Sequence, residues 1–140
     1  MPASRNVGAC MTPSPVTVGR STTLAQALKL MDERHIRHLP VVDGTHLVGL
    51  VSDRELRIVD NMQGFNAALC TVGDFIGDKP YAVPAETSVR EVVETMATKK
   101  HGSAVVVGGD GGDSVLGVFT TTDALRVFVE LLAEVERGSA

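Results

Sequence analysis

The sequence is poor in the residues that several functional classes need. Among 140 residues it has no tryptophan, one tyrosine and two cysteines. It also has no excess of positive charge, because 13 Lys and Arg stand against 17 Asp and Glu, for a net charge of −4. Proteins that bind nucleic acid neutralise phosphates with clustered basic residues. Nucleic acid is therefore not an expected partner.

The sequence also lacks long apolar runs. A helix needs about 20 consecutive apolar residues to cross a bilayer, and no segment approaches that length. The first residues have no apolar core of the kind found in secretory signal peptides. We therefore expect a cytoplasmic protein with no membrane partner.

The two cysteines, Cys10 and Cys70, stand far apart in the sequence. This placement favours reduced thiols over a disulfide or a metal pair, and no metal site is expected. A redox or metal response through the two thiols stays open as a third reading of function. Catalytic motifs are missing too, since we find no Walker loop, nucleophile elbow or zincin motif. His38 and His101 are the only candidate bases, neither with an obvious partner, so enzymatic activity is not expected.

The sequence contains an internal repeat. Residues 6–56 and 71–125 carry the same order of apolar, proline and glycine positions. The run Gly-Leu-Val-Ser-Asp-Arg-Glu from Gly49 returns as Gly-Val-Phe-Thr-Thr-Thr-Asp from Gly117, after a longer turn at 108–114. A repeat of this length predicts two copies of one structural unit.

Each copy is predicted to fold as β-α-β-β-α. An amphipathic helix follows a capping-box start at Thr23 and again at Ser88. Two apolar strands come next, and a second helix closes each copy near residues 53–62 and 121–135. The residues that we expect to pack inward from the last helix are Leu125, Phe128, Leu132 and Val135.

The pattern resembles the CBS domain, a module that occurs in tandem pairs. The run from His38 to Glu55 and the run from Leu116 to Asp123 carry the resemblance. It implies an α+β fold in which two β-α-β-β-α units pack sheet to sheet with pseudo-twofold symmetry. The boundaries that follow are residues 6–62 for unit 1, 63–70 for a connector and 71–135 for unit 2, together forming one module.

The resemblance also implies a function. Tandem CBS units bind adenosine compounds, namely AMP, ADP, ATP or S-adenosylmethionine, in clefts between the two units, and they regulate another protein. We therefore expect a stand-alone regulatory sensor that requires no cofactor, forms a homodimer and acts on an unidentified regulated protein. The alternative is a ligand-free scaffold for oligomerisation or stress response.

The family's nucleotide signature, Gly-h-x-Thr/Ser-x-x-Asp with h apolar, is complete in the second repeat from Gly117 to Asp123. By resemblance, Asp123 accepts hydrogen bonds from the ribose hydroxyls and Thr120 meets ribose or phosphate. The start of a helix also offers N–H groups to an anion. The residues implied for this cleft are Thr22, Ile36, Arg37, His38, Val118, Thr120 and Asp123.

The first repeat carries a weaker version of the signature, because Glu55 stands where the second repeat has Asp. The residues implied for this second cleft are Thr87, His101, Gly102, Leu50, Ser52 and Glu55. Both signatures also have the spacing of helix caps, Ser52 with Glu55 and Thr120 with Asp123. These four residues could therefore serve only to start helices.

Overall fold

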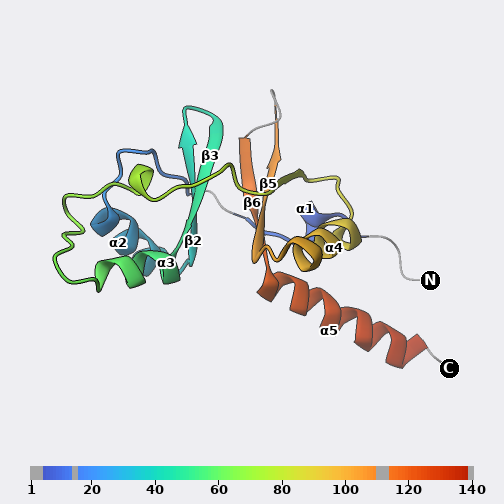
Figure 1. Cartoon of the computed structure of the whole chain (residues 1–140). Helices are drawn as coiled ribbons and strands as arrows, with labels where there is room; N and C mark the ends of the chain where they lie inside the picture. Colours follow the sequence, from blue (N-terminus) through green and yellow to red (C-terminus); the bar gives the residue numbers. More distant parts are fainter. Residues whose placement is uncertain (1–4, 14–15, 110–113, 139–140) are drawn as a thin grey trace. The chain divides into compact units, whose positions relative to one another are not determined.

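The computed structural model describes residues 5–13, 16–109 and 114–138, which form two compact units (Figure 1). We call residues 16–80 with 114–115 the first-repeat unit. Residues 5–13, 81–109 and 116–138 form the second-repeat unit. The predicted boundaries, 6–62 and 71–135, follow the repeats along the sequence. The contacts group the chain differently, because the segment that opens each repeat belongs to the unit of the other repeat.

The first-repeat unit is a β hairpin covered by helices. Figure 1 shows two helices on one side of the hairpin, and their apolar residues meet in a core that includes Leu24, Met31 and Leu39. The preceding strand that the repeat predicts is reduced to one parallel bridge between Val18 and Val41. The elements are α2 (Leu24–Arg34), β2 (His38–Asp43), β3 (His46–Ser52), α3 (Asp53–Asp60) and the 3-10 turn η1 (Val72–Asp74).

The predicted capping box of α2 is confirmed. Thr23 accepts the Gln26 N–H at 3.1 Å, and the Gln26 side chain accepts the Thr23 N–H at 2.9 Å. The helix ends at His35, which has a left-handed conformation at φ 56°. The end of the connector supplies an acceptor at this helix start, because the Leu24 N–H donates to the Cys70 carbonyl at 2.9 Å.

The second-repeat unit is a four-stranded sheet with strand order β1-β6-β5-β4. Strand β1 is antiparallel to β6, and β4 is parallel to β5. Of the predicted capping box of α4, the structure has the half in which the Ser88 side chain accepts the Glu91 N–H at 3.2 Å. Residues 110–113 of the predicted longer turn lie outside the described residues. The elements are α1 (Val7–Cys10), β1 (Thr12–Pro13), β4 (Ala82–Pro84), α4 (Val89–Lys99), β5 (Ser103–Gly108), β6 (Ser114–Thr120) and α5 (Thr121–Gly138).

The segment that opens the first repeat is part of this second unit. The Val7 N–H donates to the Thr87 carbonyl at 2.8 Å, and the Gly8 N–H donates to the Ala85 carbonyl at 3.0 Å. Val7 is fully buried. The opening helical turn predicted for each repeat is confirmed at α1 and η1, but each turn packs with the other repeat.

The prediction for the inward face of α5 is wrong. Its four expected core residues are 44–58% exposed, whereas Asp123 and Val127 are buried. The cause is the first turn of the helix, where hydrogen bonds hold the Asp123 side chain inward. Residues four and eight positions further, Val127 and Leu131, therefore face the unit's core. Within the described part of the chain, neither α5 nor any other helix is long and apolar enough to cross a membrane.

Candidate functional site

Asp123 lies at the centre of the candidate site. Only 2% of its surface is exposed, and no other charged residue in the described part of the chain is buried. Its Oδ1 accepts hydrogen bonds from the Thr12 hydroxyl at 2.9 Å and from Arg126 Nη1 at 3.2 Å. Its Oδ2 accepts from the Thr120 N–H at 2.9 Å and from the Thr120 hydroxyl at 3.1 Å. A carboxylate has about four acceptor positions, so this one is fully used.

These contacts explain how a charged group remains buried here. Burying a carboxylate without partners is costly, and the four donors offset that cost. The guanidinium of Arg126 supplies the opposite charge from a side chain that is 69% exposed. Thr12 comes from β1, 111 positions away in the sequence. The site thus joins the helix start to the segment that opens the chain's first repeat.

The structure confirms that the two polar residues of the signature form a helix cap. The Thr120 hydroxyl accepts the Asp123 N–H at 3.3 Å, while the Asp123 carboxylate accepts the Thr120 N–H. This reciprocal pair starts α5 directly where β6 ends. The same two side chains can serve a ligand only by sharing or exchanging these bonds.

The signature glycines have a packing role. A Cβ on Gly117 would lie 2.5 Å from the Thr12 carbonyl oxygen and 2.7 Å from Met11 Sδ. A Cβ on Gly49 would lie 2.5 Å from Cγ2 of Ile76. Each glycine therefore makes room for the opening segment of the other repeat, which crosses the strand at that point.

The acid of the first repeat has a different environment. Glu55 is exposed, and its carboxylate accepts a hydrogen bond from the Ser52 hydroxyl at 2.8 Å. The Ser52 hydroxyl in turn accepts the Glu55 N–H at 3.2 Å. In the repeat alignment the place of Thr12 is taken by Gly77, which has no hydroxyl to donate. The two signatures thus differ in structure as well as in sequence, because the acid of the second repeat is buried and that of the first is exposed.

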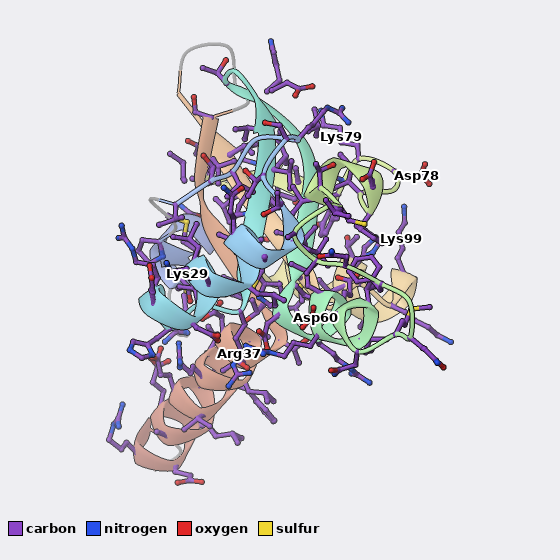
Figure 2. The ribbon with its side chains drawn as sticks, turned by 90° about the vertical axis from the view of Figure 1, so that its left-hand side faces the viewer. Lys29, Arg37, Asp60, Asp78, Lys79 and Lys99 are labelled. Carbon is purple, nitrogen blue, oxygen red and sulfur yellow. The ribbon has the colours of Figure 1, made fainter. Side chains whose placement is uncertain are left out.

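The structure groups the remaining predicted residues by unit. In the first-repeat unit His38 is the strand partner of Ser52, and the Arg37 carbonyl accepts the Asp53 N–H at 2.8 Å. The Arg37 side chain is 84% exposed (Figure 2) and has its Nη1 3.9 Å from Asp53 Oδ2. Arg37 and His38 thus lie at the start of α3, beside the weaker signature of their own unit. Thr22 lies at the start of α2, where its carbonyl accepts the Val72 N–H at 2.8 Å.

In the second-repeat unit the Gly102 carbonyl accepts both the N–H and the hydroxyl of Thr121 at 3.2 Å. His101 and Gly102, which the sequence assigned to the weaker cleft, therefore lie at the start of α5 next to Thr120. Thr87 lies further away along the chain, where its carbonyl meets α1. Val118 is buried in β6, directly opposite Thr12.

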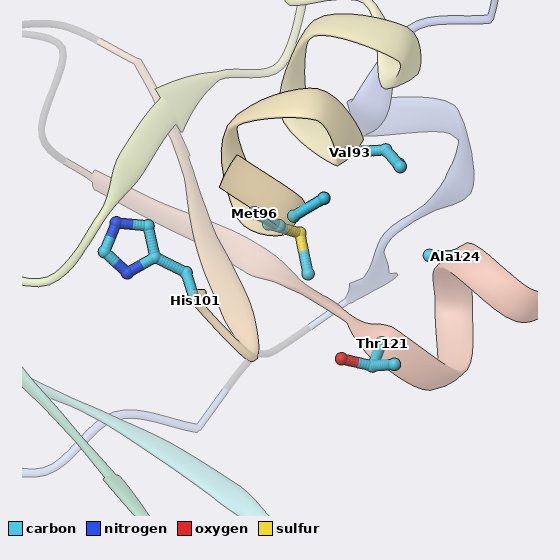
Figure 3. Close-up of a pocket in the computed structure, with 6 residues that line it drawn as sticks. Val93, Met96, His101, Thr121 and Ala124 are labelled. Atoms are coloured by element: carbon cyan, nitrogen blue, oxygen red, sulfur yellow. The ribbon is translucent and has the colours of Figure 1, made fainter. Parts of the chain in front are cut away.

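A pocket of about 190 Å³ opens between the end of α4 and the start of α5 (Figure 3). Drug-sized ligands occupy pockets of roughly 300–1,000 Å³, so this one has room for only part of a nucleotide. At its edge the ring of His101 stacks on Tyr81, with centroids 5.2 Å apart and planes 21° apart. Sequence reasoning missed this aromatic pair, although Tyr81 is the chain's single tyrosine. The residues that line the pocket are Val93, Met96, Ala97, His101, Thr121 and Ala124.

The two cysteines are free thiols, and Cys10 lies in the second-repeat unit. Within the described ranges no three His, Cys, Asp or Glu side chains gather closely enough to hold an ion. Burial raises the pKa of the Cys10 thiol, and the nearby carboxylates of Glu130 and Asp123 raise it further while Arg5 opposes them. A raised pKa keeps the thiol protonated at neutral pH, which makes it a poor nucleophile. The environment of Cys10 therefore does not favour a redox sensor.

Comparison with known proteins gives a consistent match. The family model of the CBS domain matches residues 7–60 and 72–130. CBSX1 of Arabidopsis thaliana, a chloroplastic CBS domain-containing protein, is 26% identical over 146 aligned positions, which cover 85% of this chain and 61% of CBSX1. This chain thus corresponds to less than two thirds of that relative.

Two solved structures show similar folds with bound nucleotide. CBSX2 of Arabidopsis thaliana in complex with AMP has a TM-score of 0.73 and 28% identity, covering 91% of this chain and 98% of that chain. The CBS domain of a bacterial CNNM/CorC family Mg²⁺ transporter in complex with ATP has a TM-score of 0.74 and 26% identity, covering 89% and 87%. These matches confirm the α+β fold class.

Proposed function

Because the chain belongs to the CBS domain family, with two copies of the domain in tandem, we propose that it is a regulatory module that binds an adenosine-containing ligand. The candidates are AMP, ADP, ATP and S-adenosylmethionine. The observation that carries the proposal is the similarity to a CBS pair of nearly the same extent that is solved with AMP. The complete signature from Gly117 to Asp123 supports it from this chain's own residues.

In this proposal Asp123 recognises the ribose. Two adjacent ribose hydroxyls donate to one carboxylate, which is a charge-assisted arrangement and hence of the stronger kind. Thr120 and Val118 complete the second-repeat contribution. From the first repeat the proposed ligand residues are Thr22, Ile36, Arg37 and His38. A second, weaker site is proposed to use Thr87, His101, Gly102, Leu50, Ser52 and Glu55.

Isothermal titration with the four adenosine compounds tests the proposal. At least one should bind, and Asp123→Ala should weaken that ligand by roughly 1.5–3 kcal/mol, which is about 10- to 150-fold in Kd. Asp60→Ala is the control, because it removes an exposed acid outside both proposed sites, and Glu55→Ala reports on the weaker site. Arg37→Ala in the same titration asks whether the first repeat contributes. Wild-type protein that gives no heat and no melting shift with any of the four compounds would contradict the proposal.

The ligand-free scaffold is the second candidate, and one observation favours it. Both signature acids already serve helix starts, Asp123 at α5 and Glu55 at α3. A protein that self-associates but binds none of the four adenosine compounds would support this alternative.

We also propose a homodimer that pairs through α5. The exposed apolar residues of α5 follow the 3-4-3 spacing of a helix that packs against another helix. In an antiparallel pair, Arg126 near the start of α5 would approach Glu136 near the end of the partner's helix, whereas a parallel pair would place each of these charges beside its own copy. Leu132→Glu should convert the dimer to monomer in sedimentation analysis, and Arg137→Glu on the charged face should not. A wild-type monomer at high concentration would contradict this assignment.

A further inference from the structure

The buried carboxylate of Asp123 is already saturated by donors of its own chain. We propose that Thr12 is a built-in competitor of the ligand: its hydroxyl holds the Asp123 oxygen that a ribose hydroxyl needs. Binding at Asp123 then detaches the Thr12 side chain and weakens the anchoring of β1. This inference rests on the proposed function and adds a coupling between the ligand and the segment at residues 5–13.

The two oxygens of the carboxylate are not equally exchangeable. Both donors to Oδ2 belong to Thr120, the residue that begins α5, so they cannot leave without disturbing the helix start. Both donors to Oδ1 can leave without disturbing the helix start. Arg126 is an exposed side chain that can turn into water, and Thr12 lies on a strand of two exposed residues. A ligand can therefore replace the hydrogen-bond donors at Oδ1.

The pairing of β1 with β6 places the Thr12 hydroxyl beside this oxygen. Thr12 pairs with Val118 and Pro13 pairs with Gly117 in the β1–β6 register. The missing side chain of Gly117 lets β1 approach closely enough for that pairing. Because β1 is only two residues long, the Thr12–Asp123 bond is a large share of what holds its end.

The first repeat provides an internal comparison. Gly77 takes the place of Thr12 there, and the carboxylate of Glu55 is exposed with a hydroxyl donor only from Ser52. At the position equivalent to Thr12, that unit has no hydroxyl that could compete with a ligand. The competition is thus a property of the second repeat alone.

The test compares AMP and ATP binding to wild type and to Thr12→Val, which keeps the branched shape and removes the hydroxyl. The valine variant should bind about tenfold more tightly, because the ligand no longer has to break a hydrogen bond to a charged group. Thr12→Ser retains the hydroxyl and should bind like wild type. Thr122→Val removes an exposed hydroxyl one residue from Asp123 and should change nothing.

Linkage requires the reverse effect as well. In wild type, bound AMP or ATP should accelerate hydrogen exchange in the peptide covering residues 7–13, and in Thr12→Val the exchange should be fast without ligand. If Thr12→Val folds poorly, Arg126→Met removes the other donor to Oδ1 and should also tighten binding. Binding to wild type with equal or weaker binding to Thr12→Val would overturn the inference and leave the proposed function standing. Absence of binding in every variant would overturn both.

Discussion

Removal of the Asp123 carboxylate should destabilise the second-repeat unit specifically. Asp123→Ala removes a reciprocal cap at the start of α5, which is worth about 1 kcal/mol. It also leaves the Thr120 N–H without its acceptor in a partly buried place, which costs about 1–3 kcal/mol. The expected loss is therefore about 2–4 kcal/mol of unfolding free energy. Glu55→Ala removes an exposed acid and should cost less than about 0.5 kcal/mol.

Asp123→Asn should fall between these two variants. One amide oxygen can still accept from Thr120, and the amide nitrogen can donate to the Thr12 hydroxyl oxygen. Arg126 then loses its acceptor, but its side chain is 69% exposed and can be hydrated. Asp123→Ala should therefore lose the most unfolding free energy, Asp123→Asn less, and Glu55→Ala the least.

Native-state hydrogen exchange followed by NMR measures this loss separately in each unit, because slow amides of β5 and α4 report the second-repeat unit and those of β2 report the first. The first-repeat amides serve as the internal control. Asp123→Ala that changes the second-repeat free energy by less than about 0.5 kcal/mol, or lowers both units equally, would refute the assigned role of the carboxylate.

Two further predictions concern the glycines and the thiol. Gly117→Ala and Gly49→Ala should each lower the melting temperature, because the new Cβ would lie 2.5 Å from the Thr12 carbonyl oxygen in one variant and 2.5 Å from Cγ2 of Ile76 in the other; a variant as stable as wild type would contradict this. Cys10 should react with iodoacetamide at neutral pH more slowly than in the denatured chain and should accelerate as the pH rises, since its pKa is raised; equal rates in both states, measured by mass spectrometry, would contradict this.

Local signals predicted much of this fold. The capping residues Thr23 and Ser88 mark the true starts of α2 and α4, because a cap depends only on residues within one helical turn. The inequality of Asp123 and Glu55 was also visible in the sequence, and it corresponds to a buried acid and an exposed one.

Contacts between residues far apart in the chain could not be predicted from local sequence patterns. The bond from Thr12 to Asp123 spans most of the chain, and no periodic pattern records it. It holds the first turn of α5 with Asp123 inward and so decides which apolar residues of that helix face the core. The sequence of α5 carries two apolar faces, and the structure buries the one that follows Asp123 at Val127 and Leu131. The pairing of Tyr81 with His101 likewise depends on packing between separate segments.

The exchange of opening segments has a consequence for synthesis on the ribosome. Residues 5–13 are synthesised well before the rest of their unit, which is complete only when α5 at Thr121–Gly138 has been made. The first-repeat unit, in contrast, needs only residues 114–115 beyond residue 80. During that interval residues 5–13 lack the segments that they pair with, and a matching segment of another copy could take their place.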